Sequence, residues 1–171
     1  MQDARVYLGL VQERGKKGLP ITRVYRQLYN RDLYLIAYGK IYRNAGAMTQ
    51  GTTGETVDSM SLAKIDAIIN ALIDALRQER YHWKPVRRVC IPKRNSTKKR
   101  ALGLPTWSDK LLQEVIRLIL EAYFEPNFSD HSHGFRPQRG CHTALKDIYE
   151  SWAGVTWFIE GDISACFDHA S

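Results

Sequence analysis

Asp162, near the end of the sequence, follows a predicted strand and could act as a metal ligand. Val155–Ile159 is a near-continuous apolar run of β-prone residues, typical of a buried strand, and Asp162 follows it. Mg²⁺ prefers hard oxygen ligands and usually takes one or two carboxylates, so an Asp at a strand end suits two-metal phosphoryl transfer. The spacing from Asp162 to Phe167 and Asp168 is short and unspecific by itself. Strand-terminal Asp residues also cap turns, so the structural interpretation stays open at this point.

The charges are distributed in alternating blocks along the chain. Residues 1–45 carry a net charge of +6, residues 46–83 carry −2, residues 84–100 carry +8 and residues 101–171 carry −5. A basic first part followed by an acidic last part indicates polyanion binding next to a site that requires carboxylates. A solvated surface is the alternative explanation for any one basic cluster.

Length and composition limit the class of protein. The 171 residues suit one domain or one lobe of a larger protein, and 44% hydrophobic with 25% charged residues is ordinary for a globular chain. No run approaches 18 apolar residues, so we expect no membrane span. The amphipathic N-terminus lacks the apolar region of a secretory signal.

The cysteines and histidines are not spaced for zinc. The cysteines are isolated and form no CxxC pair, which argues against zinc and against a disulfide framework and fits a reducing compartment. Three of the histidines lie in one expected loop and helix start, without a fourth ligand at zinc spacing. These residues are Cys90, Cys141, Cys166, His131, His133 and His142.

Helical periodicity dominates the first half of the chain. We expect helices over residues 1–14 and 20–44, the second with a break at Asn30–Asp32. Residues 44–54, with three glycines, predict a loop. Residues 61–79 predict a helix, because their apolar side chains recur at spacings of three and four.

The most basic block predicts a hairpin. Residues 86–91 and 100–104 favour strands, and Asn95–Thr97 supplies the turn between them. The cations of residues 84–100 would then lie along two adjacent strands. Trp83, which precedes the first strand, is the one tryptophan that we consider for RNA contact; the others are expected in the core.

A long helix and a polar loop follow the hairpin. Thr106–Asp109 has the pattern of a capping box and opens a helix over about residues 110–124, which Pro126 ends. Residues 129–139 predict a polar loop, and residues 142–151 a short helix.

Four blocks of residues occur in a specific order. They read IPKR from Ile91, KRALGLP from Lys99, SHGFRPQR from Ser132 and GDISACFD from Gly161. Together they resemble the successive blocks of group II intron-encoded reverse transcriptase/maturases, over roughly residues 34–171. The resemblance implies an α+β, helix-rich fold: the fingers subdomain of a right-hand polymerase with the first palm strand.

The resemblance also implies a division of the chain into three parts. Residues 1–55 match the N-terminal extension, residues 56–154 the fingers, and residues 155–171 the start of the palm with its first catalytic Asp. The Tyr-Ala-Asp-Asp box, which supplies the second catalytic Asp in this family, does not occur in the sequence. We therefore expect the chain to be a fragment that is inactive alone.

The metal and the sugar would be contacted by the last block. By resemblance, Asp162 is the first metal-binding aspartate and the catalytic residue, and the Ile163 carbonyl is a further ligand of Mg²⁺. Phe167 matches the aromatic residue that blocks a ribose 2′-hydroxyl, whereas Asp168 is expected to be structural.

The triphosphate and the template would be contacted by basic residues. Lys93 and Arg100 match the fingers residues that hold the incoming dNTP, which suits charge-assisted phosphate contacts. Arg136 matches the arginine that shapes the nucleotide and template pocket, and a turn role beside Pro137 is the structural alternative.

Three functions are compatible with these observations. The first is a part of an RNA-directed DNA polymerase that contacts template, primer and dNTP. The second is a module that binds intron RNA for splicing without catalysis. The third is a truncated product that self-associates, as a homodimer, through its palm-facing surface. We expect a bacterial cytoplasmic setting without a membrane, with an organelle as the alternative.

Overall fold

The structure, a computed structural model, describes residues 2–92, 97 and 99–163. The chain forms two compact units, Met1–Asn127 and Phe128–Ser171. Helices predominate, and the described strands form one two-stranded antiparallel sheet. The α+β, helix-rich class is confirmed. The division at residues 55 and 154 is a functional one and stays a prediction.

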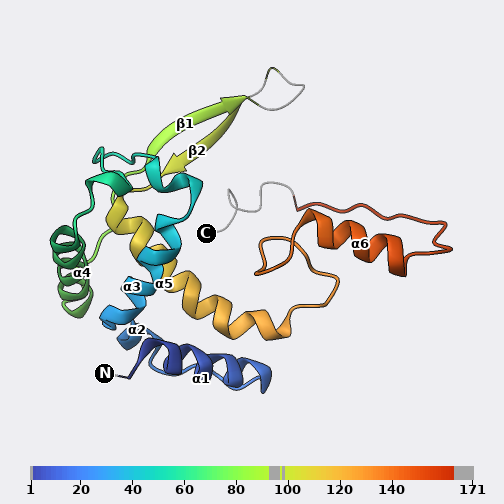
Figure 1. Cartoon of the computed structure of the whole chain (residues 1–171), viewed down its shortest axis with the longest axis horizontal. Coiled ribbons are helices and arrows are strands. Elements are labelled where there is room, and N and C mark those ends of the chain that lie inside the picture. Colours follow the sequence, from blue (N-terminus) through green and yellow to red (C-terminus); the bar gives the residue numbers. More distant parts are fainter. Residues whose placement is uncertain (1, 93–96, 98, 164–171) are drawn as a thin grey trace. The chain divides into compact units, whose positions relative to one another are not determined.

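Helix α5 (Trp107–Phe124) is the central element of the first unit (Figure 1). Thr106 caps it, since its hydroxyl accepts from the Asp109 N–H at 3.4 Å. The predicted start is therefore confirmed, and Pro126 lies in the single 3₁₀ turn Glu125–Asn127 that follows. The buried face of α5 contains Trp107, Leu111, Leu112, Val115, Leu118 and Ile119.

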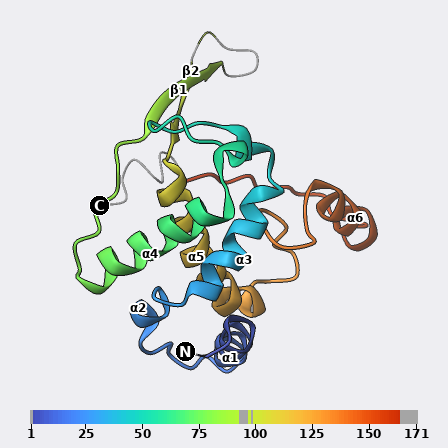
Figure 2. The same ribbon diagram turned by 60° about the vertical axis from the view of Figure 1, so that its left-hand side comes forward.

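Helices α1 (Ala4–Lys16) and α3 (Arg31–Tyr42) pack against α5 (Figure 2). The two helices are joined through α2 (Val24–Gln27). Gly15 faces the Tyr123 carbonyl so closely that a Cβ would overlap it, so only glycine allows this approach. The predicted break is confirmed: the Asn30 side chain accepts from the Asp32 N–H at 3.1 Å and caps α3.

Helix α4 (Leu62–Arg77) closes the core from another side. Ser61 caps it by accepting from the Lys64 N–H at 3.2 Å. Its spacing of apolar residues predicts the buried face correctly, because burial of one stripe is what stabilises such a helix. The buried residues are Ile65, Ile69, Leu72, Ile73 and Leu76.

The predicted hairpin consists of β1 (Arg87–Pro92) and β2 (Lys99–Leu104), with Val89 opposite Leu102 and Ile91 opposite Arg100. It projects from the helices of the first unit (Figure 1). Its base is attached to the 44–54 loop, which contains one 3₁₀ turn, Ala45–Met48. The Arg87 guanidinium donates twice to the Gln50 carbonyl, at 3.1 and 2.8 Å.

Two further contacts fix this loop. The Lys110 ammonium donates to the Thr49 carbonyl at 2.6 Å, and burial lowers the pKa of Lys110. A Cβ at Gly51 would overlap the Pro105 carbonyl. The 44–54 loop is therefore packed onto the start of α5. A second 3₁₀ turn, Val57–Ser59, connects it to α4.

The second unit contains α6 (Cys141–Ser151) and irregular segments before and after it. The predicted buried strand at Val155–Ile159 is wrong: these residues form no strand and are exposed, Ile159 to 93%. A strand needs a neighbour for its backbone N–H and C=O groups. No described segment pairs with this one.

Candidate functional site

Asp162 and Ile163 lie at the end of the described part of the second unit, on exposed irregular backbone. Phe167 and Asp168 lie outside the described residues. Among the residues that the structure describes, no three His, Cys, Asp or Glu side chains gather around a common point. The Asp162 carboxylate and the Ile163 carbonyl are hard oxygen donors of the kind that Mg²⁺ takes, and they fit a partial ligand set that is open to further ligands.

The hairpin carries exposed cations on both faces. Residues alternate between faces along a strand, so Arg100 shares one face with Arg87, whereas Arg88 and Lys99 share the other. Arg87 is held by the Gln50 carbonyl. No ion pair of Arg100 occurs among the described residues, so its guanidinium is available to an anion. Lys93, the other predicted triphosphate contact, lies outside the described residues.

The 128–140 loop, which carries Arg136, has an unusual backbone. Phe135 and Gln138 both adopt positive φ, 58° and 59°. A non-glycine residue in this region is uncommon, and for a bulky side chain it is strained unless surrounding contacts fix it. The ring of Phe135 is fully exposed, so packing of that ring does not compensate.

Arg136 supplies contacts that fix the backbone of this loop. Its Nη1 donates to the Ser129 carbonyl at 2.6 Å and to the Ser132 carbonyl at 2.8 Å. The guanidinium lies over the Phe128 ring, 5.3 Å from the centroid. Arg139 adds an ion pair with Asp130 at 3.1 Å. These contacts tie Arg136 to the backbone of its own loop, and its predicted role towards the nucleotide and the template stays a prediction.

The same loop is tied to α6 by two histidines and one carboxylate. The Asp147 carboxylate faces His131 Nδ1 at 2.8 Å and His133 Nε2 at 3.3 Å. His133 also contacts the Thr143 hydroxyl at 2.9 Å. The hydrogen bond and charge of Asp147 raise the pKa of His131. In turn, hydrogen bonds from His131, His133 and Ser151 lower the pKa of Asp147 to about 2.

A buried carboxylate in the first unit fixes the segment between α4 and β1. Asp109 is 1% exposed and accepts from the Tyr81 hydroxyl, from the Thr106 hydroxyl at 2.8 Å and from the Lys84 N–H at 3.3 Å. Burial, followed by the hydrogen bond to Asp109, raises the pKa of Tyr81. The capping-box pattern detects the Thr106–Asp109 pair, but it does not indicate the partners at Tyr81 and Lys84.

The predicted site residues are thus distributed over both units. Arg100 belongs to the first unit, whereas Arg136, Asp162 and Ile163 belong to the second. The His131–Asp147–His133 network is the feature that sequence reasoning missed in the second unit. The sequence feature that could have indicated this network is a pair of histidines in a polar loop directly before a helix that carries a carboxylate.

Comparison with protein families matches residues 91–171 to the family described as reverse transcriptase (RNA-dependent DNA polymerase). The match includes β2, the 128–140 loop and Asp162. No helix within the described residues is long and apolar enough to cross a membrane.

Several individual proteins similar to the chain have names that refer to introns. The chain is 52% identical over 148 residues to the group II intron-encoded protein LtrA of Lactococcus lactis, covering 86% of the chain and 24% of that protein. It is 46% identical over 157 residues to an uncharacterized 91 kDa protein in the cob intron of Schizosaccharomyces pombe, covering 89% and 19%. A 65-residue stretch is 46% identical to the mitochondrial nuclear intron maturase 1 of Arabidopsis thaliana, covering 38% and 9%. The chain spans about a quarter or less of the length of these relatives.

Proposed function

We propose that the chain belongs to the family of group II intron-encoded reverse transcriptases and supplies the fingers and the start of the palm of an RNA-directed DNA polymerase. The observation that carries this proposal is the order of the four blocks, IPKR, KRALGLP, SHGFRPQR and GDISACFD, in a chain that is 52% identical to LtrA over 148 residues. The family match over residues 91–171 supports it.

Asp162 is the catalytic residue of this proposal. Two-metal enzymes use Mg²⁺ to activate the attacking hydroxyl and to stabilise the leaving pyrophosphate. Asp162 would hold this ion with its carboxylate and Ile163 with its carbonyl oxygen. The exposed backbone around both residues leaves room for the remaining ligands, which include phosphate oxygens of the dNTP.

Lys93 and Arg100 bind the triphosphate in this proposal. A guanidinium can donate two parallel hydrogen bonds to phosphate oxygens, and the exposure of Arg100 on β2 supports this role. Arg136 acts through the 128–140 loop. By holding the Ser129 and Ser132 carbonyls it fixes the shape of a loop that contacts the template and the nucleotide.

RNA is the proposed polymeric partner. The names of the relatives associate them with introns, and one of them is named a maturase. The +8 block of residues 84–100 gives the first unit a surface for the phosphates of intron RNA and of a template. RNA binding for splicing and DNA synthesis would then use overlapping surfaces. A bacterial cytoplasm is the proposed setting, with an organelle as the alternative.

Selection of deoxynucleotides tests the proposed polymerase. Phe167 would lie beneath the sugar, where a ribose 2′-hydroxyl overlaps its ring, so the ring acts against the wrong substrate. In the full-length protein, Phe167→Val should admit ribonucleotides and retain much of the dNTP incorporation. The measurement is the ratio of dNTP to rNTP incorporation on an RNA template. Phe158→Val, which changes an exposed ring outside the block, is the control. An unchanged ratio in the Phe167 variant would show that this assignment is wrong.

A further inference from the structure

Segment 79–84, which joins α4 to β1, contributes to two cavities of different character. A cavity of about 560 Å³ is lined by Glu79, Tyr81 and Trp83. A second cavity of about 430 Å³ is lined by Arg80, His82 and Lys84, and by the other side of Tyr81. Glu79 adopts a positive φ of 53° in the turn after α4, and after it Trp83 lines only the first cavity, whereas Arg80 and Lys84 line only the second. The segment therefore places Trp83 and the carboxylate of Glu79 at the first cavity, and the cations Arg80 and Lys84 at the second.

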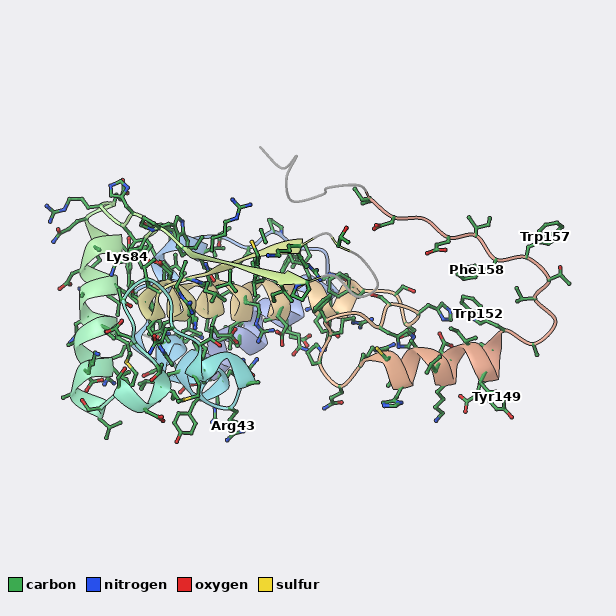
Figure 3. The ribbon with its side chains drawn as sticks, turned by 90° about the horizontal axis from the view of Figure 1, so that it is seen from above. Arg43, Lys84, Tyr149, Trp152, Trp157 and Phe158 are labelled. Atoms are coloured by element: carbon green, nitrogen blue, oxygen red, sulfur yellow. The ribbon has the colours of Figure 1, made fainter. Side chains whose placement is uncertain are left out.

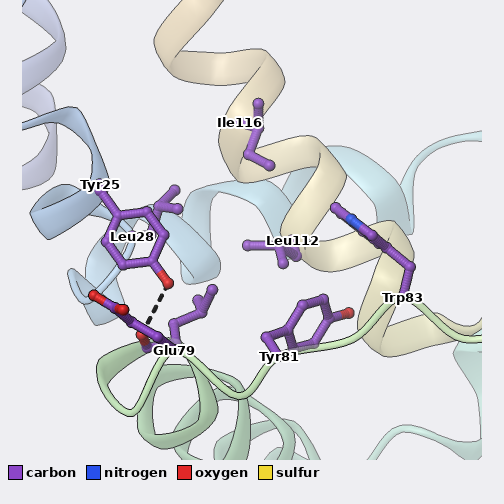
Figure 4. Close-up of a pocket in the computed structure, with 8 residues that line it drawn as sticks. Tyr25, Leu28, Glu79, Tyr81, Trp83, Leu112 and Ile116 are labelled. Carbon is purple, nitrogen blue, oxygen red and sulfur yellow. Dashed lines mark hydrogen bonds between the residues drawn. The ribbon is translucent and has the colours of Figure 1, made fainter. Parts of the chain in front are cut away.

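The first cavity is an apolar hollow with an aromatic rim (Figure 4). Its floor is made of side chains from α4, α5 and the turn after α2, and its rim includes Tyr25 and Trp83, which are 44% and 54% exposed. Tyr81 and Trp83 meet edge to face, with ring centroids 5.4 Å apart. The floor residues are Leu28, Leu76, Leu112 and Ile116.

Hydrogen bonds hold two of the rim rings in place without the need for a ligand. The Tyr25 hydroxyl donates to the Leu76 carbonyl at 2.9 Å (Figure 4, dashed line). The Tyr81 hydroxyl donates to the buried Asp109. Because these rings are already positioned, a flat aromatic ligand loses little binding energy to their ordering. The cavity is preformed for a planar group.

The second cavity supplies positive charge next to this planar site. Within the described part of the chain, no ion pair engages Arg80, His82 or Lys84. The one carboxylate that lines the cavity, Glu55, is paired with Lys64 at 2.9 Å. Lys84, labelled in Figure 3, is exposed. An anion can reach these cations.

We propose that segment 79–84 binds one unpaired nucleotide of an RNA strand. The base enters the aromatic cavity and stacks on Trp83, while Arg80 and Lys84 bind the adjoining phosphates. Stacking on an aromatic side chain with cations beside it is how single-stranded nucleic acids are held. The inference rests on the proposed function, because it names a site for the RNA that this protein is proposed to bind.

Glu79 gives this cavity a preference among bases. Its carboxylate can only accept hydrogen bonds, so it favours a base edge that carries an amino group. Guanine, adenine and cytosine have such a group, and uracil does not. A bulged guanosine should therefore bind more tightly than a bulged uridine. Glu79→Gln, which adds a donor, should reduce that difference.

The test compares two RNA hairpins of equal length, one fully paired and one with a single bulged guanosine. The 171-residue chain should bind the bulged hairpin at least about fivefold more tightly, which corresponds to the lower end of base–aromatic stacking. Trp83→Ala should remove this preference and leave the affinity for the paired hairpin unchanged. Trp157→Ala, which changes an exposed tryptophan of the second unit, should retain the preference. Arg80→Gln should weaken binding of both hairpins and lower the salt dependence by about one phosphate contact.

Each result separates the inference from the function on which it rests. Equal affinity of the unaltered chain for both hairpins would overturn the nucleotide site and leave the proposed RNA binding intact. Retention of the bulge preference by the folded Trp83→Ala variant would overturn it as well. Failure of the unaltered chain to bind either hairpin at low salt would instead count against the proposed RNA-binding function. Thermal unfolding of each variant establishes that it is folded.

Discussion

The two units of this chain are stabilised in different ways. The first unit has a continuous core of buried apolar side chains from α1, α3, α4 and α5. In the second unit, none of the described residues is buried, and its loop is held by charged and polar contacts around Asp147 and Arg136. Burial of apolar area dominates folding free energy, whereas exposed ion pairs contribute little. The first unit can therefore fold by its own contacts, and the second depends more on its surroundings.

The apolar side chains of the second unit support this difference. Tyr149, Trp157 and Phe158 are largely exposed and Trp152 is 39% exposed; all four are labelled in Figure 3. Helix α6 is amphipathic, yet its apolar residues Leu145 and Ile148 are also exposed. Contiguous exposed apolar groups mark surfaces that contact other protein. In a polymerase, the rest of the palm would be that protein.

The largest difference between the two units should appear in the free energy of unfolding when one leucine of each unit is truncated to alanine. Leu33 is fully buried and Leu145 is 63% exposed. Leu33→Ala should lower the free energy of unfolding by about 2–5 kcal/mol, because it removes buried methyl groups and leaves a cavity. Leu145→Ala should change it by less than about 0.5 kcal/mol. Urea unfolding measures both values, and equal losses would contradict the proposed difference between the units.

The polar network should make the second unit sensitive to pH. Asp147 has a lowered pKa, so its stabilising contribution is complete above the ordinary value of 3.8 and is lost as the pH falls towards 2. His131 has a raised pKa, so its contribution is complete below the ordinary value of 6.5 and is lost as the pH rises through the raised value. Order in the 128–140 loop should therefore be greatest between these two limits.

Asp147→Asn should abolish this pH dependence. The measurement is hydrogen-exchange protection of loop amides at pH 5 and pH 8, where the unaltered chain should be better protected at pH 5. The variant should lose severalfold in protection and show little difference between the two pH values. Glu150→Gln, which changes only an exposed pair with Lys146 at 3.7 Å, is the control. A control that behaves like the Asp147 variant would show that the network is not responsible.

The smallest expected effect is the change that a single substitution causes in self-association. We expect the isolated chain to form dimers or larger species through the exposed residues 155–163. Ile159→Lys should weaken this association modestly, since several neighbouring apolar side chains remain. Val6→Lys, at an exposed position of α1 in the first unit, should have no effect. Sedimentation at several concentrations gives the masses, and a strictly monomeric unaltered chain would contradict the expectation.

Local patterns predict the parts of the fold that depend on local contacts. The apolar spacing of α4 and α5, the Thr106 cap and the Asn30 break follow from interactions within a few residues, and each is confirmed. The strand at Val155–Ile159 fails, because strand formation depends on partners that a local pattern does not contain.

The sequence predicts which residue types form the candidate site better than it predicts which groups those residues contact. The sequence identifies Arg136, but its partners are carbonyls four and seven residues away in a strained loop. It also singles out His131 and His133 in the polar loop, but not their common partner Asp147, which lies in the following helix. The pairing of Tyr81 with Asp109 spans 28 residues and has no signature in either segment.

The central claim is that Asp162 binds the catalytic metal of a polymerase, and one measurement tests it directly. In the full-length protein, Asp162→Ala should abolish DNA synthesis on an RNA template and leave RNA affinity and thermal stability unchanged, because the side chain is exposed. Glu160→Ala, two residues earlier and also exposed, should retain synthesis. Full DNA synthesis by the Asp162 variant would contradict the claim.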